Sequence, residues 1–174
     1  MKIKENVVFL GMMGSGKSSL GLLFSKKFDL EFFDIDKIIE NKMNMTILKI
    51  FEIKGENFFR KLEEKTTLEI LKKKNIVISL GGGGFLNKHI RKEIINNHIS
   101  FWLNWRNRTL IERIKNSSKR PIAIKSSEIE LLKLIKKRSH IYSKAMYKID
   151  CENHTKKELV NKLIKIYETK KTNN

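Results

Sequence analysis

Residues Asn6–Ser18, NVVFLGMMGSGKS, are the part of the sequence that most clearly indicates a fold. The apolar run Asn6–Leu10 predicts a buried strand, and the residues from Lys17 onward predict a helix. Between them, Gly11–Ser18 fit the spacing G-x-x-x-x-G-K-[ST] of a phosphate-binding loop. Glycines let consecutive backbone N–H groups face one anion, and the N-terminus of the helix adds partial positive charge. A structural glycine-rich turn is the alternative, but the flanking strand and helix favour a nucleotide-binding loop.

The residue types in this loop assign its chemistry. In such loops the lysine bridges the β- and γ-phosphates, and the hydroxyl that follows it binds Mg²⁺. We therefore expect Lys17 to act in catalysis and Ser18 to be a ligand of one Mg²⁺ ion. The residues expected to contact the nucleotide are Gly14, Ser15, Gly16, Lys17, Ser18 and Ser19.

Outward from the loop, short apolar runs alternate with helical patterns. Further strands are expected at Leu30–Asp34, Ile76–Leu80, Ile99–Leu103 and Tyr147–Cys151. Helices are expected at about 17–28, 37–43, 46–53, 57–74, 87–95, 106–115, 128–145 and 155–168. Apolar strands that alternate with helices predict a three-layer α/β/α fold with a five-stranded parallel sheet. The absence of a repeat or linker in 174 residues favours one domain, residues 1–174.

The composition is strongly basic, with 37 Lys and Arg against 19 Asp and Glu and a net charge of +18. The basic residues are scattered along the chain, which favours a solvated basic surface over a nucleic-acid footprint, although the charge should attract anionic substrates. The single cysteine, Cys151, allows no internal disulfide, and no apolar run is long enough for a membrane span. We expect a cytoplasmic monomer that binds no specific nucleic acid and no membrane.

Other segments separate the classes of P-loop protein. The chain has no N-K-x-D guanine motif, and the third strand runs into Ser79–Gly84 without the magnesium-linked Asp of many P-loop ATPases. The second strand instead supplies Asp34 and Asp36, which lie two apart on a strand and so on one face, where open α/β sheets bind ligands. Alternatively, the two aspartates cap the next helix. Gly81–Gly83 should bring backbone N–H groups close to a ligand, although tight turns also use glycine.

Six motifs together resemble the shikimate kinase family, in the family's order and over most of the chain. They are GMMGSGKS at Gly11–Ser18, FFDID at Phe32–Asp36, GENFFRKLE at Gly55–Glu63, GGG at Gly81–Gly83, KRP at Lys119–Pro121 and RSHIY at Arg138–Tyr142. The resemblance implies a lid at about 116–127 and a mobile substrate-binding region at about 34–63. It also implies that the chain uses ATP and Mg²⁺ to phosphorylate the 3-hydroxyl of shikimate in aromatic amino-acid biosynthesis.

The resemblance further implies which residues serve the substrate. Asp34 would help to hold Mg²⁺, and Asp36 would bind the substrate hydroxyls and orient or deprotonate the attacking one. Arg60, held in place by Glu63, would grip the substrate carboxylate, because a planar guanidinium matches a carboxylate with two parallel hydrogen bonds. The other residues implied to bind substrate are Gly81, Gly82, Gly83 and Arg138.

Arginines are also implied at the nucleotide. Arg120, beside Pro121 in the lid, would reach the transferring phosphoryl group as a catalytic residue. Arg113 would stack on adenine, and an exposed helical arginine without a ligand is the alternative. Tyr142 is expected to be packing. Gly84 departs from the family pattern, which often has a larger residue there, and predicts local flexibility.

Two other functions stay open from the sequence. One is another small-molecule P-loop kinase, of the gluconate or nucleoside-monophosphate type. The other is a basic, nucleic-acid-binding P-loop protein without metabolite kinase activity.

Overall fold

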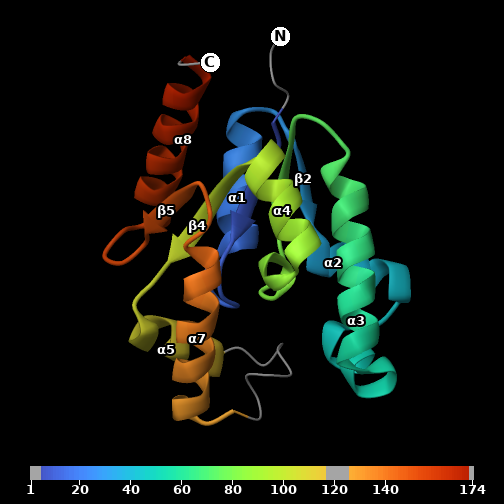
Figure 1. Cartoon of the computed structure of the whole chain (residues 1–174). Helices are drawn as coiled ribbons and strands as arrows, with labels where there is room; N and C mark the ends of the chain where they lie inside the picture. Colours follow the sequence, from blue (N-terminus) through green and yellow to red (C-terminus); the bar gives the residue numbers. More distant parts are fainter. Residues whose placement is uncertain (1–4, 117–125, 173–174) are drawn as a thin grey trace.

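Five parallel strands form the centre of the computed structural model, which describes residues 5–116 and 126–172 (Figure 1). The strands are β1 Val7–Leu10, β2 Glu31–Asp34, β3 Ile76–Ser79, β4 Ile99–Asn104 and β5 Tyr147–Asp150. Their order in the sheet is β2-β3-β1-β4-β5, and every neighbouring pair is parallel. The predicted α/β fold with a five-stranded parallel sheet is confirmed.

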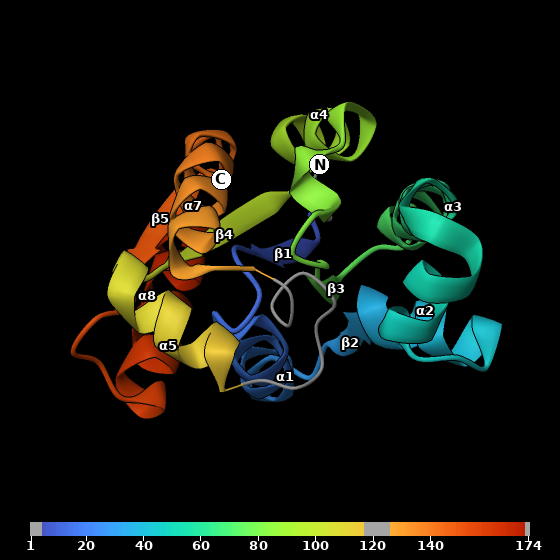
Figure 2. The same cartoon turned by 90° about the horizontal axis from the view of Figure 1, so that it is seen from below.

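Helices cover both faces of the sheet (Figure 2). The alternation of side chains along β1 divides the core, because Val7 and Phe9 face one helix layer while Val8 and Leu10 face the other. The first layer consists of α1 Lys17–Lys27 and α8 Lys156–Thr172. The second layer consists of α2 Ile35–Met43, α3 Ile47–Leu71, η1 Gly84–Leu86, α4 Lys88–Asn97, α5 Asn107–Lys115 and α7 Glu128–Tyr142.

The junction of β2 and α2 differs from expectation. The strand ends at Asp34, whose side chain accepts a hydrogen bond of 3.3 Å from the Lys37 amide and so caps α2. Asp36 therefore lies in the first turn of α2, and the prediction that both aspartates share one face of a strand was wrong. An aspartate N-cap satisfies a helix amide that would otherwise lack a partner, which makes the chain turn from strand to helix at this residue.

The expected break between the helices at 46–53 and 57–74 is present at Gly55. The structure has one helical segment, Ile47–Leu71, in which Gly55 adopts φ 81° and ψ 165°. Such a φ is strained for residues with a Cβ atom, so glycine allows α3 to change direction there. The helix then continues into the turns that carry Arg60 and Glu63.

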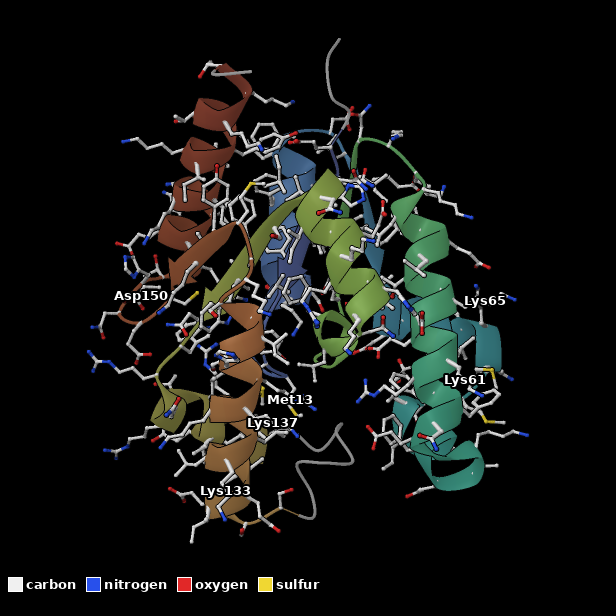
Figure 3. All side chains as sticks on the ribbon, in the orientation of Figure 1. Met13, Lys61, Lys65, Lys133, Lys137 and Asp150 are labelled. Carbon is white, nitrogen blue, oxygen red and sulfur yellow. The ribbon has the colours of Figure 1, made fainter. Side chains whose placement is uncertain are left out.

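Basic side chains are spread over the surface. The lysines labelled in Figure 3, Lys61 and Lys65 on α3 and Lys133 and Lys137 on α7, are all exposed. No helix within residues 5–116 and 126–172 combines the length and apolar character that a bilayer crossing requires.

Candidate active site

The phosphate loop follows β1 at its carboxyl end and leads directly into α1. Gly14 and Gly16 adopt φ values of 76° and 90°, and Gly16 is the residue that precedes the first turn of α1. These left-handed conformations favour glycine and curl the backbone at the helix N-terminus, which is a suitable place for an anion. Ser18 and Ser19 lie in that first turn.

Lys17 is buried, and its ammonium group is held inside the loop. Its Nζ donates hydrogen bonds to the carbonyl oxygens of Gly11 at 3.1 Å and Met12 at 2.9 Å. The charge is thus placed at the loop by main-chain oxygens, which is where the loop spacing predicted it.

Two hydroxyl groups meet beside the loop, next to the strand end that carries Asp34. Ser18 Oγ lies 3.4 Å from Ser79 Oγ at the end of β3, and Ser79 is the register partner of Asp34 in β2. Hydroxyl and carboxylate oxygens are hard donors, and Mg²⁺ in P-loop sites takes few protein ligands and keeps phosphate oxygens and water. Across the described residues no cluster of three His, Cys, Asp or Glu could hold a metal. The donor set therefore fits a Mg²⁺ ion bound mainly through phosphates.

Ser79 was missed in the sequence. It is buried at the end of β3, where many P-loop ATPases carry a metal-linked aspartate. A hydroxyl residue at the carboxyl end of an otherwise apolar strand, just before the glycines, was the signal that could have identified it.

An open pocket lies between α3, α7 and the glycine loop after β3. It contains five of the six residues expected to bind substrate, the sixth being Gly81. Its lining is Met13, Asp36, Ile47, Phe51, Phe59, Arg60, Glu63, Gly82, Gly83 and Arg138. Met13 belongs to the phosphate loop, so the pocket adjoins the place where a γ-phosphate would lie. The apolar lining residues Ile47, Phe51 and Phe59 were not predicted to reach the pocket, because apolar residues at helical spacing indicate only a buried helix face.

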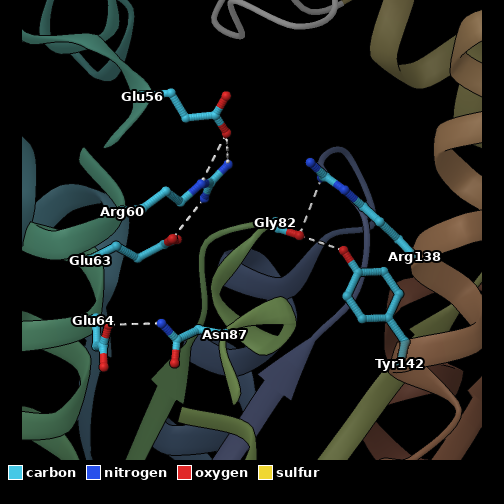
Figure 4. Close-up of polar contacts among 8 residues, drawn as sticks. All are labelled: Glu56, Arg60, Glu63, Glu64, Gly82, Asn87, Arg138 and Tyr142. Atoms are coloured by element: carbon cyan, nitrogen blue, oxygen red, sulfur yellow. Dashed lines mark hydrogen bonds and ion pairs between the residues drawn. The ribbon is translucent and has the colours of Figure 1, made fainter. Parts of the chain in front are cut away.

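Arg60 is clamped by two glutamates of its own helix (Figure 4). Its Nη1 donates to Glu63 at 2.7 Å, while Nε and Nη2 donate to Glu56 Oε1 at 3.2 and 3.1 Å. Glu63 is buried, which raises the pKa of its carboxyl group, and the charge of Arg60 opposes that rise. Glu63 Oε1 has no hydrogen-bond partner among the described residues. The predicted Arg60–Glu63 pair is present, and the pair with Glu56 adds to it.

The Gly82 carbonyl oxygen is shared by two donors from α7, as Figure 4 shows. Arg138 Nη1 donates to it at 3.3 Å, and the Tyr142 hydroxyl donates to it as well. Burial raises the pKa of Tyr142 to about 12, which keeps the hydroxyl protonated as a donor. Arg138 is buried too, and its Nε has no partner among the described residues. Tyr142 packs as expected, but it also fixes the main chain of the glycine loop.

Successive glycines of this loop make room for different charged side chains. A Cβ atom on Gly81 would lie 2.5 Å from Glu63 Oε1 and 2.7 Å from Asp36 Oδ1, and one on Gly83 would lie 2.6 Å from Arg60 Cζ. Such distances are well inside van der Waals contact, so the side chains would have to move.

The neighbouring glycines are less crowded. A Cβ atom on Gly82 would lie 3.3 Å from the Met13 amide nitrogen and 3.6 Å from Arg138 Nη1. On Gly84 it would meet nothing closer than 3.6 Å, so this position has room for a Cβ atom. The glycine run thus explains the close approach of Arg60, Asp36 and Arg138 to one loop.

One aromatic and one cationic side chain, Trp105 and Arg113, contact the phosphate loop. The Arg113 guanidinium carbon is 3.6 Å from the centroid of the Trp105 ring, and its Nη1 reaches the Gly14 carbonyl at 3.5 Å. Trp105 donates its indole N–H to the Ser15 carbonyl at 3.0 Å. Arg113 is thus next to the loop, as the expected adenine contact requires. Arg120 and Pro121 of the expected lid lie outside the described residues.

Comparisons with known proteins agree with this geometry. Residues 13–168 match the family model described as "Shikimate kinase". A shikimate kinase of Thermodesulfovibrio yellowstonii is 37% identical over 94% of this chain and 95% of its own length, and one of Bacillus subtilis is 37% identical over 92% and 88%.

Solved structures lead to the same group. A shikimate kinase from Acinetobacter baumannii in complex with shikimate has a TM-score of 0.89 at 28% identity, covering 95% of this chain and 94% of its own. A gluconokinase from Sinorhizobium meliloti reaches a TM-score of 0.54 at 14% identity, with 97% of both chains covered, which shows a shared fold alone.

Proposed function

The chain belongs to the shikimate kinase family, and from this premise we propose that it transfers the γ-phosphoryl group of ATP to the 3-hydroxyl of shikimate. The products are shikimate 3-phosphate and ADP, in the biosynthesis of aromatic amino acids. The observation that carries the proposal is the convergence of Arg60, Arg138 and Asp36 on one pocket beside the phosphate loop. Two guanidinium groups suit a carboxylate, and a carboxylate suits neighbouring hydroxyls.

At the acceptor end, Arg60 and Arg138 bind the carboxylate of shikimate. Arg138 is buried with Nε unpartnered among the described residues, so an anion would satisfy a donor that the protein leaves open. Glu63 and Glu56 hold Arg60 in the required orientation. Asp36 accepts a hydrogen bond from the attacking hydroxyl and aligns it with the γ-phosphorus, because phosphoryl transfer depends chiefly on positioning.

At the phosphate end, the backbone of Gly14–Ser19 and the N-terminus of α1 bind the phosphates. Lys17 exchanges a main-chain carbonyl for the β- and γ-phosphate oxygens and stabilises the charge that spreads over them. Ser18 and Asp34 would hold one Mg²⁺ ion, with Ser79 beside them. When bound, Mg²⁺ supplies further neutralisation of the phosphate charge.

Two arginines complete the proposed nucleotide site. Arg113 stacks on adenine, and Arg120 approaches the transferring phosphoryl group from the lid at about 116–127. The assignment of Arg120 comes from the sequence alone. Arg120→Ala should lower the turnover number by at least about 10²-fold, as for other groups that stabilise transition-state charge. A higher KM for ATP with an unchanged turnover number would show that Arg120 serves only ground-state binding.

A coupled assay of ADP release tests the function directly. Shikimate, gluconate, AMP and CMP are compared as acceptors at saturating ATP and Mg²⁺. We expect ADP release with shikimate to exceed that with each other acceptor by at least about 10³-fold, because only shikimate offers both the carboxylate and the hydroxyls that this pocket binds. Equal or greater turnover with gluconate or a nucleotide would overturn the proposal.

The same proposal covers the setting of the enzyme. We treat residues 1–174 as one domain, with a substrate-binding region at about 34–63, acting as a cytoplasmic monomer. No specific nucleic acid or membrane is among its partners. A sequence-specific complex with DNA or RNA at physiological salt would contradict this.

A further inference from the structure

Trp105 and Arg113 make more contacts, with each other and with the phosphate loop, than an adenine contact requires. Trp105 follows β4, and Arg113 lies nearly two turns along α5. The guanidinium carbon lies over the indole ring at 3.6 Å from its centroid, which is a close cation–π contact. Both groups also bond to the phosphate loop, through the carbonyls of Ser15 and Gly14. Indole, guanidinium and loop main chain therefore form one connected unit.

Arg113 needs such support because it is exposed. A free arginine side chain populates many rotamers, and fixing it on a ligand costs conformational entropy. The indole of Trp105 holds one face of the guanidinium before any ligand arrives. The opposite face is then presented as a flat cation beside the phosphate loop, which is complementary to the π-face of a purine.

The indole N–H adds a second function that packing alone does not explain. Trp105 is half-buried and packs against the core on both sides of the sheet. An indole donor usually finds an acceptor when it is buried, and here the acceptor is the carbonyl of a residue within the phosphate loop itself. The position of the loop and the position of the guanidinium are therefore both set by one side chain.

We infer that Trp105 is a positioning residue for the nucleotide, which holds Arg113 flat for adenine and fixes the phosphate loop through Ser15. The ligand class is a purine nucleoside triphosphate. This inference rests on the proposed function for the identity of the nucleotide, and it extends that proposal to a residue that touches neither the phosphates nor the acceptor.

Graded variants separate the two contacts of Trp105. Trp105→Phe removes the indole N–H and keeps an aromatic face, whereas Trp105→Leu removes both. The matched control is Trp102→Phe, the same change three residues earlier in the buried part of β4. We expect the KM for ATP to rise roughly 3-fold in Trp105→Phe and roughly 10-fold or more in Trp105→Leu, from one lost hydrogen bond and one lost cation–π contact. The KM for shikimate and the turnover number should stay within about 2-fold, because neither contact reaches the reacting atoms.

Base preference provides a readout that a merely structural role would not move. The ratio of kcat/KM for ATP to that for CTP should fall several-fold in Trp105→Leu, since a smaller ring gains less from an ordered stack. It should be unchanged in Trp102→Phe. An unchanged ratio in a folded Trp105→Leu protein, or equal rises in both Michaelis constants, would overturn the inference.

Direct binding of ADP supplies a test that needs no turnover. With Trp102→Phe as the background, Trp105 is the sole tryptophan of the chain, and its fluorescence should change on titration with ADP but not with shikimate. The ADP dissociation constant of the Trp105→Phe protein, measured by calorimetry, should rise with its KM for ATP. Absence of the fluorescence change would contradict the inference. A failure of the wild-type protein to use shikimate would instead contradict the proposed function. The ADP titration would still test the role of Trp105 in nucleotide binding.

Discussion

The phosphate loop and the acceptor pocket are both proposed to bind an anion, and they differ in the groups they offer to it. The loop uses main-chain groups from eight consecutive residues, with Lys17 held by its own loop carbonyls. The acceptor pocket uses side chains from α2, α3 and α7, which reach a glycine loop after β3. Glycine curls the backbone in the first region, and in the second it provides space for other residues.

We expect this difference to determine how each region responds to amino-acid substitution. Main-chain binding depends on local conformation, so the loop should fail at the chemical step when its charge is removed. Side-chain binding depends on several elements meeting, so the acceptor pocket should lose affinity for one substrate while ATP binding continues.

The largest effect is expected from Lys17→Ala. Loss of the charge that bridges the phosphates should lower the turnover number by at least about 10³-fold, because this charge acts most strongly in the transition state. Lys26→Ala, an exposed change on the same helix, is the control and should keep wild-type activity. Circular dichroism and steady-state kinetics check folding and rate. Near-normal turnover in Lys17→Ala would remove the loop from catalysis.

Gly83→Ala and Gly84→Ala form a pair that tests the space in the acceptor pocket. The new methyl group would displace the Arg60 guanidinium in the first variant, whereas it has room in the second. We expect the KM for shikimate to rise roughly 10- to 100-fold in Gly83→Ala, the range for charge-assisted hydrogen bonds, and to stay near wild type in Gly84→Ala. The KM for ATP should change in neither. Equal behaviour of the two variants would show that the glycines do not act through Arg60.

Arg60→Lys keeps the positive charge of the pocket and removes the planar guanidinium group. An ammonium group cannot make two parallel hydrogen bonds to a carboxylate, so we expect roughly a 10-fold higher KM for shikimate. Arg108→Lys is the matched control, because Arg108 is exposed and bonds only to Glu112 on its own helix among the described residues. Initial-rate measurements with each substrate varied in turn give both Michaelis constants. A comparable increase for ATP would count against a carboxylate clamp.

The smallest predicted effect is a pH dependence confined to the acceptor side. Because burial raises the pKa of Glu63, this carboxyl group gains its proton at higher pH than an ordinary glutamate and then holds Arg60 less well. The KM for shikimate should therefore rise a few-fold as the pH falls from about 8 to about 5, toward the ordinary range of carboxyl pKa values. In Glu63→Gln this dependence should be lost, while Glu69→Gln, an exposed change on α3, should retain it.

The contribution of Glu63 to the stability of the fold should increase as the pH falls, whereas its contribution to shikimate binding should decrease. A carboxyl group whose pKa is raised in the folded state binds its proton more tightly there than in the unfolded state. Its contribution to stability is therefore present at low pH and decreases as the pH rises through the folded pKa. Denaturant unfolding of wild type and Glu63→Gln across this range measures the effect, and parallel pH profiles of the two proteins would contradict it.

The two regions also differ in how far the sequence could predict them. The phosphate loop was predicted because its function lies in consecutive residues between one strand and one helix. Arg60 and Glu63 were predicted to pair because they lie three positions apart on a helix. That β2 ends at Asp34 and that Asp36 lies in α2 was not predicted, since the sequence left open whether the two aspartates belong to the strand or cap the helix.

Other contributions depend on contacts between distant segments. Ser79 reaches Ser18 only through the order of the strands, and Tyr142 reaches Gly82 only through the packing of α7. Residue type and periodicity describe both as ordinary core. The hydrogen bond from Trp105 to Ser15 likewise joins segments 90 residues apart.

The central position of β1 has a consequence for the order in which the protein matures. Val7 pairs with Val77 in β3 and with Ile99 in β4, so the strand that carries the phosphate loop has no sheet neighbour until those later segments leave the ribosome. Parallel pairings between such distant segments form slowly and leave apolar strands uncovered in the meantime. Nascent chains that stop before β4 should therefore fail to retain nucleotide on an ATP resin, even though they contain the whole loop. Retention should begin only once β4 has emerged, so nucleotide binding would report when the centre of the sheet forms during translation.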